Sequence, residues 1–268
     1  MADSKRVAGS DRITPESPTW QGSQAEGYSA PFRSPPYGLP PYPMDYARVM
    51  LVAFEPNTEE IRAAIPEPLE WVEGSLAVAS IGDHRQMPFG LKFQEGLVAL
   101  KVRFNGEVGR FVPYIWTSAD EPTVIGREVM GWPKLLCDHN ETQLLGSQAS
   151  AVITRRGETL MRTSIALEEA GTLDDLPLGG ALFTVRKIQM PQRGAPALKQ
   201  VIRYDLGDSF RLNSLWQGRG FVEMPGQAFS AVHRLMRKST DAAWMMDASW
   251  ELGWGEILWE NWVPATTP

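Results

Sequence analysis

The chain has 268 residues, 43% of them hydrophobic and 22% charged, which is typical of a soluble globular protein. A net charge of −6 excludes a broad basic face, so we expect no nucleic-acid partner. Cys137 is the only cysteine, and the sequence contains neither a signal peptide nor a run of about 18 apolar residues. We therefore expect a cytoplasmic protein with no membrane segment.

Residues 1–45 differ in composition from the rest of the chain. Prolines recur there among many Ser, Gly and Gln residues, at positions 15, 18, 31, 35, 36, 40, 41 and 43. Such a segment cannot hold a helix or a central strand. We predict a partly extended or disordered N-terminal arm over 1–45, followed by one domain over 46–268.

The domain begins with a strand, a helix and a second strand. Residues 48–54 form a short apolar run typical of a buried strand. Asn57, with an acidic residue three positions later, indicates a helix start, and Pro66 predicts that this helix ends at residue 65. Residues 76–81 predict the second strand.

Two hairpins follow. The apolar segments 97–104 and 109–116 flank Asn105-Gly106, the strongest short signal for a tight β-turn. A second hairpin is predicted over 149–166. Further predicted elements are strands over 181–190, 203–206 and 248–254, a short helix over 123–130 and a turn near 227–236.

Many short strands and few helices predict a mainly β protein, with an antiparallel sheet that is closed as a barrel or stacked as a sandwich. No linker divides residues 46–264.

Several kinds of chemistry lack their motifs. The sequence has no phosphate-binding loop, no dinucleotide-binding glycine pattern and no nucleophile elbow. Cys137 and His139 are capable of binding a metal. Neighbours in a strand point to opposite faces, so we expect no metal site around Asp138 between them.

One lysine stands in an unusually apolar stretch, residues 126–136. Lys134 follows Trp132-Pro133 and precedes Leu135 and Leu136. One interpretation is a surface lysine whose stem lies along apolar surface while its ammonium reaches water. The other is a desolvated lysine that attacks a carbonyl carbon.

A family resemblance bears on this choice. Gly126-Arg127-Glu128 followed by Trp132-Pro133-Lys134 resembles the Gly-Arg-Glu…Tyr/Phe-Pro-Lys motif of the acetoacetate decarboxylases. Residues 66–70 resemble another family segment, and so does Phe93-Gln94-Glu95 leading to residues 104–106. These matches occur in the same order and at similar spacing.

The resemblance implies a closed antiparallel β-barrel with a cone-like cavity, in which Lys134 forms a Schiff base with a ketone. It implies decarboxylation of a β-keto acid without metal or organic cofactor, and a homo-oligomer. Glu95 matches a family glutamate and is a candidate proton carrier, although a solvated loop carboxylate is an equal interpretation. Arg127 and Trp132 of the lysine stretch are candidate substrate-binding residues.

The sequence also departs from the family pattern. Leu135 stands where decarboxylases have a second lysine, and a family cavity glutamate falls near Ala79-Ser80. An expected arginine aligns closest to Ala47, which leaves Arg48 as a substrate-binding candidate one residue away. These losses admit two alternatives. One is an aldolase-dehydratase that joins or cleaves a keto acid such as pyruvate and an aldehyde. The other is a non-catalytic small-molecule-binding barrel.

Overall fold

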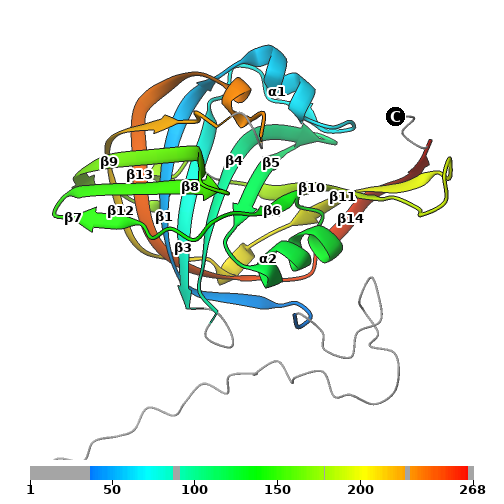
Figure 1. Cartoon of the computed structure of the whole chain (residues 1–268), viewed down its shortest axis with the longest axis horizontal. Helices are drawn as coiled ribbons and strands as arrows, with labels where there is room; N and C mark the ends of the chain where they lie inside the picture. Colours follow the sequence, from blue (N-terminus) through cyan, green and yellow to red (C-terminus); the bar gives the residue numbers. More distant parts are fainter. Residues whose placement is uncertain (1–36, 87–90, 178, 227–229, 265–268) are drawn as a thin grey trace, which may run out of the picture. The chain divides into compact units, whose positions relative to one another are not determined.

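The computed structural model describes residues 37–86, 91–177, 179–226 and 230–264. The chain divides into two units, Met1–Leu39 and Pro40–Pro268, and only residues 37–39 of the first are described. Within the described part, every helix and strand belongs to the second unit (Figure 1).

The second unit is mostly β, as predicted. The helices are short: α1 (Thr58–Ala64), α2 (Asp120–Ile125), the π-helix η2 (Gly126–Met130) and the 3₁₀ turns η3 (Leu173–Asp175), η4 (Gly207–Ser209) and η5 (Val232–Leu235). The strands are β1 (Tyr42–Pro56), β2 (Glu70–Trp71), β3 (Ala77–Gln86), β4 (Phe93–Phe104), β5 (Glu107–Thr117), β6 (Lys134–Leu136), β7 (Gln143–Leu145), β8 (Gln148–Arg155), β9 (Glu158–Ala170), β10 (Ala181–Ile188), β11 (Ala197–Tyr204), β12 (Arg211–Glu223), β13 (Met236–Leu252) and β14 (Glu256–Val263).

The fourteen strands of the described residues belong to one sheet, paired in the order β14-β11-β10-β5-β4-β3-β1-β13-β12-β9-β8-β7, with β2 on β4 and β6 on β5. The ladders are antiparallel except those of β5 with β10 and with β6. Among the described residues no ladder joins β14 to β7, so strand pairing does not close the sheet and the closed barrel stays a prediction. One backbone hydrogen bond, from Asp138 N–H to Thr154 C=O (2.8 Å), links the segment after β6 to β8.

The two predicted hairpins are confirmed. β4 and β5 turn at Asn105 (φ 49°) and Gly106 (φ 86°), and β8 and β9 turn at Arg156 (φ 52°) and Gly157 (φ 80°). Consecutive positive φ values are typical of the turn whose twist matches that of the flanking strands.

Other boundaries differ from the prediction. β1 begins at Tyr42, inside the last four residues of the expected arm, and β11 begins at Ala197 rather than at 203. The short strands β2, β6 and β7 and the longer β12 and β14 were not predicted. Gly218 makes β12 look like a loop in the sequence, but a Cβ there would lie 2.0 Å from the Ala166 carbonyl oxygen, so this strand depends on a close backbone approach. Of the predicted turn near 227–236, residues 227–229 lie outside the described residues.

The central strands are buried on both faces. On what we call the first face, Met50, Val52 and Phe54 of β1 join a large apolar cluster. On the second face, Val49 and Leu51 join another cluster, which includes partly buried tryptophans. Because neighbouring strand residues alternate between faces, a side chain's position in its strand decides which cluster surrounds it.

In Figure 1, α1 lies at one end of the strands and α2 lies beside β6. None of the helices in the described ranges is long and apolar enough to cross a membrane.

Candidate active site

The lysine stretch reaches the sheet through an irregular helix end. The π-helix ends at Gly131, whose φ of 80° is a left-handed conformation that glycine adopts without strain. The Trp132 N–H then donates to the Gly126 carbonyl oxygen (2.8 Å), and β6 starts at Lys134. Pairing places Lys134 beside Ile115, a residue of the second-face cluster. Lys134 therefore extends from the edge of the sheet toward the second face.

Lys134 is buried, with 7% of its surface exposed. Its stem packs on Gly126, where an added Cβ would lie 2.5 Å from Lys134 Cδ and 2.9 Å from Cγ and from Cε. Real Cβ atoms are not found so close to another heavy atom. The first residue of the family motif is thus a glycine because the lysine stem occupies the space of its missing side chain.

The buried ammonium is paired with the predicted glutamate. Lys134 Nζ donates to Glu95 Oε2 over 2.7 Å, and it lies 5.3 Å from the centre of the Trp132 ring. A charged hydrogen bond and an aromatic face both stabilise an ammonium ion, while burial opposes it. The structure thus brings together three of the residues singled out from the sequence, and Glu95 is not a solvated loop carboxylate.

His84 is a further member of the site that the sequence did not indicate. Its Nε2 lies 3.9 Å from Glu95 Oε1, and its ring stacks on Phe93 with 4.3 Å between centroids. The Trp250 ring meets it edge-on at 5.7 Å. The register of β3 and β4 explains why His84 is at the site. Glu95 of β4 pairs with Gly82 of β3, and His84 lies two residues further along the same face of β3.

The protonation of this group follows from burial and charge. Burial opposes ionisation of Glu95, but the positive charge and hydrogen bond of Lys134 outweigh it, so the pKa of Glu95 lies below its ordinary value. Burial lowers the pKa of His84, and the nearby Lys134 lowers it further, against the pull of Glu95. His84 is therefore a neutral imidazole near pH 7, and its Nδ1 has no hydrogen-bond partner among the described residues.

Arg127 lies close to the site without entering it. It is exposed on the π-helix, and its Nη1 donates to the backbone carbonyl oxygen of Lys134 over 3.2 Å. The contact fixes the backbone from which the Lys134 side chain extends. Trp132 contacts Lys134 on one side and Tyr204 on another, with 5.4 Å between ring centroids.

The structure does not bring Arg48 to Lys134. Arg48 lies between Ala47 and Val49 of the second-face cluster, so its side chain occupies the first face. There its Nε and Nη2 donate to the two carboxylate oxygens of Asp247 at 2.8 and 2.9 Å. Burial opposes ionisation of Asp247, but the Arg48 guanidinium outweighs it and keeps the pKa of Asp247 below its usual value. This placement does not support a substrate-binding role for Arg48.

The structure locates two residues at which the sequence departs from the family pattern. Leu135 has 39% of its surface exposed and follows Lys134 in β6, so the two side chains take opposite faces. Ser80 is buried on β3, in the same alternation as His84 and hence on the second face. The face that carries Lys134 thus presents Ala47 and Ser80, neither of which carries a charge.

The segment Cys137-Asp138-His139 has structural contacts. Burial, with Asp138 nearby, raises the pKa of the Cys137 thiol to about 12. The Asp138 carboxylate accepts the backbone N–H groups of Arg156 and Gly157 and so orders the β8–β9 turn. His139 Nδ1 lies 2.9 Å from the Ser118 hydroxyl oxygen. Within the described part of the chain, no three His, Cys, Asp or Glu residues are grouped so as to hold a metal ion.

The fold and site define a class: a mostly antiparallel β protein with a buried lysine–glutamate pair beside its central strands. The family model described as "Acetoacetate decarboxylase (ADC)" matches residues 29–261. The chain belongs to the acetoacetate decarboxylase family.

Individual relatives are distant in sequence but similar over most of their length. The acetoacetate decarboxylase of Burkholderia vietnamiensis is 24% identical over 243 residues, covering 88% of this chain and 96% of the relative. The crystal structure of acetoacetate decarboxylase from Legionella pneumophila has a TM-score of 0.78 at 18% identity, covering 88% of this chain and 94% of the other.

A second solved structure is also similar in fold. The enduracididine biosynthesis enzyme MppR, complexed with the condensation product of pyruvate and imidazole 4-carboxaldehyde, has a TM-score of 0.76 at 15% identity. The match covers 89% of this chain and 98% of that protein.

Proposed function

We propose that this protein is a cofactor-independent lyase in which Lys134 forms a Schiff base with a keto acid, and that its reaction is the decarboxylation of a β-keto acid. The observation that carries the proposal is the buried pair of Lys134 and Glu95, 2.7 Å apart, in a chain of the acetoacetate decarboxylase family. A buried amine with a carboxylate in contact has both a nucleophile and a proton acceptor in place.

The chemistry starts with a proton transfer. Lys134 Nζ donates a hydrogen bond to Glu95, and the amine becomes a nucleophile when its extra proton passes to that carboxylate or to water. The neutral amine adds to the ketone carbon, and loss of water gives an iminium ion. The iminium accepts the electron pair of the breaking C–C bond, so CO2 leaves and an enamine remains. Protonation of the enamine carbon and hydrolysis then release the ketone and restore Lys134.

Glu95 is the group that we assign to the proton transfers, since it is within hydrogen-bond distance of the reacting nitrogen. His84, at 3.9 Å from its second oxygen, is too distant for a direct hydrogen bond. We assign His84 a positioning role, since its stacked ring limits where the Glu95 carboxylate can lie.

A second candidate is an aldolase-dehydratase that acts on a keto acid such as pyruvate and an aldehyde. It is favoured by Ala47 and Ser80, because uncharged residues on the face of Lys134 suit a larger and less polar substrate. The fold similarity to MppR, bound to a condensation product of pyruvate and an aldehyde, adds support. The same iminium and enamine intermediates serve this reaction.

Borohydride trapping tests the common step of both candidates. The protein is incubated with acetoacetate or with pyruvate, reduced, digested and analysed by mass spectrometry. We expect a covalent adduct on Lys134, its loss in Lys134→Ala, and its retention in the matched surface variant Lys238→Ala. Absence of any adduct on Lys134 refutes the lyase and leaves the non-catalytic small-molecule-binding protein.

Product analysis chooses between the two lyase reactions. Release of CO2 from acetoacetate, lost in Lys134→Ala, supports decarboxylation. Loss of pyruvate that requires an added aldehyde, without CO2 release, supports the aldolase-dehydratase. Full activity of Lys134→Ala in either assay removes Lys134 from the mechanism.

Three sequence predictions belong to the same proposal. The protein is a cytoplasmic homo-oligomer, the residues before Pro40 form an arm outside the catalytic domain, and the sheet closes as a barrel around the Lys134 site. Sedimentation analysis of the full chain and of a chain that begins at residue 40 tests the oligomer and shows whether the arm is needed for it. A monomer in both cases contradicts the oligomer.

A further inference from the structure

The edge of β5 has a gap in its pairing. β10 pairs with β5 at Gly109–Phe111, and β6 pairs with the same edge of β5 at Ile115–Thr117. Residues 112–114 of β5, between these two ladders, pair with neither β10 nor β6 on this edge. Pro113, which has no backbone N–H to leave unpaired, occupies the middle of the gap. A hollow of about 350 Å³ lies here, within the range of small-molecule sites.

Three cations line this hollow. They are Arg127 from the π-helix and the neighbouring pair Arg186 and Lys187 from β10, and no Asp or Glu lines it. Among the described residues neither arginine forms an ion pair, and the Arg127 side chain donates one hydrogen bond, to the Lys134 carbonyl oxygen. Because no carboxylate of the described residues lines the hollow, an anion bound there would stabilise the two arginines.

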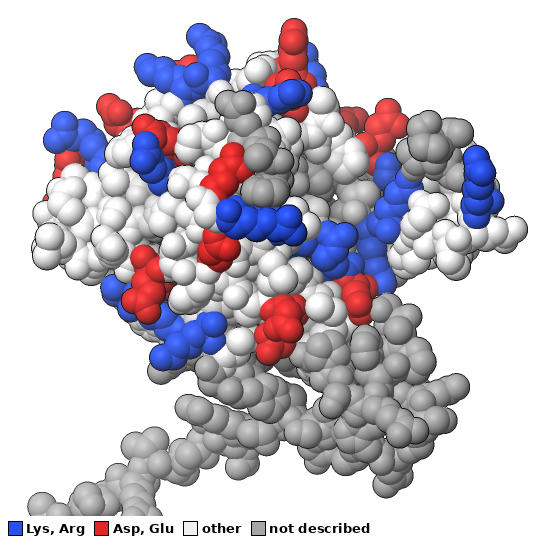
Figure 2. All heavy atoms as spheres, in the orientation of Figure 1, with Lys and Arg blue, Asp and Glu red and all other residues white. Residues whose placement is uncertain are grey.

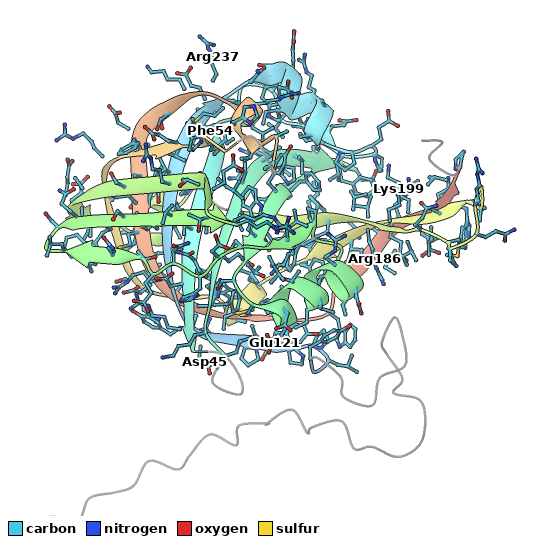
Figure 3. All side chains as sticks on the ribbon, viewed as in Figure 1. Asp45, Phe54, Glu121, Arg186, Lys199 and Arg237 are labelled. Carbon is cyan, nitrogen blue, oxygen red and sulfur yellow. The ribbon has the colours of Figure 1, made fainter. Side chains whose placement is uncertain are left out.

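Figure 2 shows blue side chains gathered where the β10–β11 hairpin leaves the rest of the sheet. Figure 3 labels Arg186 in the same region. The chain as a whole carries a net charge of −6, so the positive charge around the hollow is local and does not reflect the overall composition.

The rest of the lining is apolar. It includes Ala63, Ala64 and Pro66, in and just after α1, together with Phe111, Val185 and Trp132. A hollow with apolar walls and guanidinium groups fits a ligand that has an apolar body and an anionic head, since a guanidinium binds carboxylate and phosphate oxygens in pairs.

We propose that this hollow, which we call the β5 window, is a second binding site that takes an organic anion, a carboxylate or phosphate monoester on an apolar body. Arg186 and Arg127 bind the head, and Arg127 also links the ligand to the backbone of Lys134. The window is distinct from the proposed Schiff-base site, because Lys134 does not line it.

Isothermal titration calorimetry on the full chain tests the window with four probes: phenyl phosphate, phenylacetate, inorganic phosphate and the uncharged 2-phenylethanol. We expect phenyl phosphate or phenylacetate to bind at one site, at least about tenfold more tightly than inorganic phosphate and 2-phenylethanol, and more weakly as salt increases. Preference for phenyl phosphate assigns a phosphate ester, and preference for phenylacetate assigns a carboxylate.

Variants locate the binding. Arg186→Ala, and separately Arg186→Gln with its side-chain volume largely kept, should weaken the preferred probe at least about tenfold, since each removes one charged contact. Arg237→Ala removes an exposed arginine far from Arg186 in Figure 3 and should leave binding unchanged. Lys134→Ala should also retain binding, which separates this result from the Schiff-base proposal.

Two results overturn the proposal. One is the absence of binding by both aromatic anions at millimolar concentration. The other is binding that Arg186→Ala and Arg186→Gln leave unchanged while both variants melt at the wild-type temperature. Binding of inorganic phosphate as tight as that of phenyl phosphate also contradicts the assigned ligand class, because the apolar walls would then contribute nothing.

Discussion

Gly126→Ala is the substitution whose effect on the site follows most directly from the structure. Gly126 has ordinary right-handed helical angles (φ −58°, ψ −43°), so its backbone accepts alanine without strain. Alanine is favoured over glycine in a helix by about 1 kcal/mol. The new Cβ, however, would lie 2.5 Å from Lys134 Cδ. Only the lysine stem has to move.

The displacement can be estimated. Ordinary contact begins at 3.4 Å, so the stem must move back by about 3.4 − 2.5 = 0.9 Å. Added to the 2.7 Å from Nζ to Glu95, this gives about 3.6 Å, which is no longer a hydrogen bond. A misplacement of about 1 Å costs a reaction on the order of 10²-fold. We expect trapping of Lys134 by borohydride to slow by about that factor, and stability to fall by about 1–3 kcal/mol because the buried pair with Glu95 is weakened.

The assay compares trapping rates with the keto acid that labels the wild type, alongside thermal melts. Gly253→Ala is the matched control, because an added Cβ there has nothing within 4 Å. It should trap at the wild-type rate. The reasoning is refuted if Gly126→Ala traps within twofold of the wild type, or if it loses activity only because it unfolds.

Glu95→Gln should slow turnover about 10²- to 10⁴-fold while the protein stays folded, as shown by steady-state kinetics and circular dichroism, because a general acid–base is lost; an undiminished rate would contradict the assignment. Folding lowers the pKa of His84 below its value in the unfolded chain. The stability that follows from keeping His84 neutral is therefore fully present above about pH 6.5 and is lost as the pH falls toward the folded-state pKa. The loss is no more than about 1.4 kcal/mol per pH unit. In His84→Gln, denaturant melts between pH 7 and 5 should show a shallower loss, and an unchanged slope would argue against a buried neutral imidazole. Arg48→Met removes the ion pair of Asp247 and should cost about 1–3 kcal/mol in urea unfolding without slowing Schiff-base trapping; slower trapping with intact stability would return Arg48 to the site.

Local signals in the sequence predicted much of the first half of the domain. The Asn105-Gly106 turn and the β-branched runs beside it were sufficient for β4 and β5, because turn type and strand alternation are local properties. β12 was missed for the opposite reason. Gly218 reads as a break in a strand, and only the neighbouring Ala166 backbone shows that the space for a side chain is occupied.

The same division applies to the candidate site. The sequence singled out Lys134 by its apolar setting and its family motif, and a separate resemblance at Phe93-Gln94-Glu95 led to Glu95, which lies 39 residues away in the chain. Only the tertiary structure decided which side chains share the face of that lysine. Strand register places His84 beside Glu95, and the alternation of β1 turns Arg48 away from Lys134 toward Asp247. A shift of one residue in register reverses a side chain's face, and register is fixed by packing across the whole sheet rather than by any local segment.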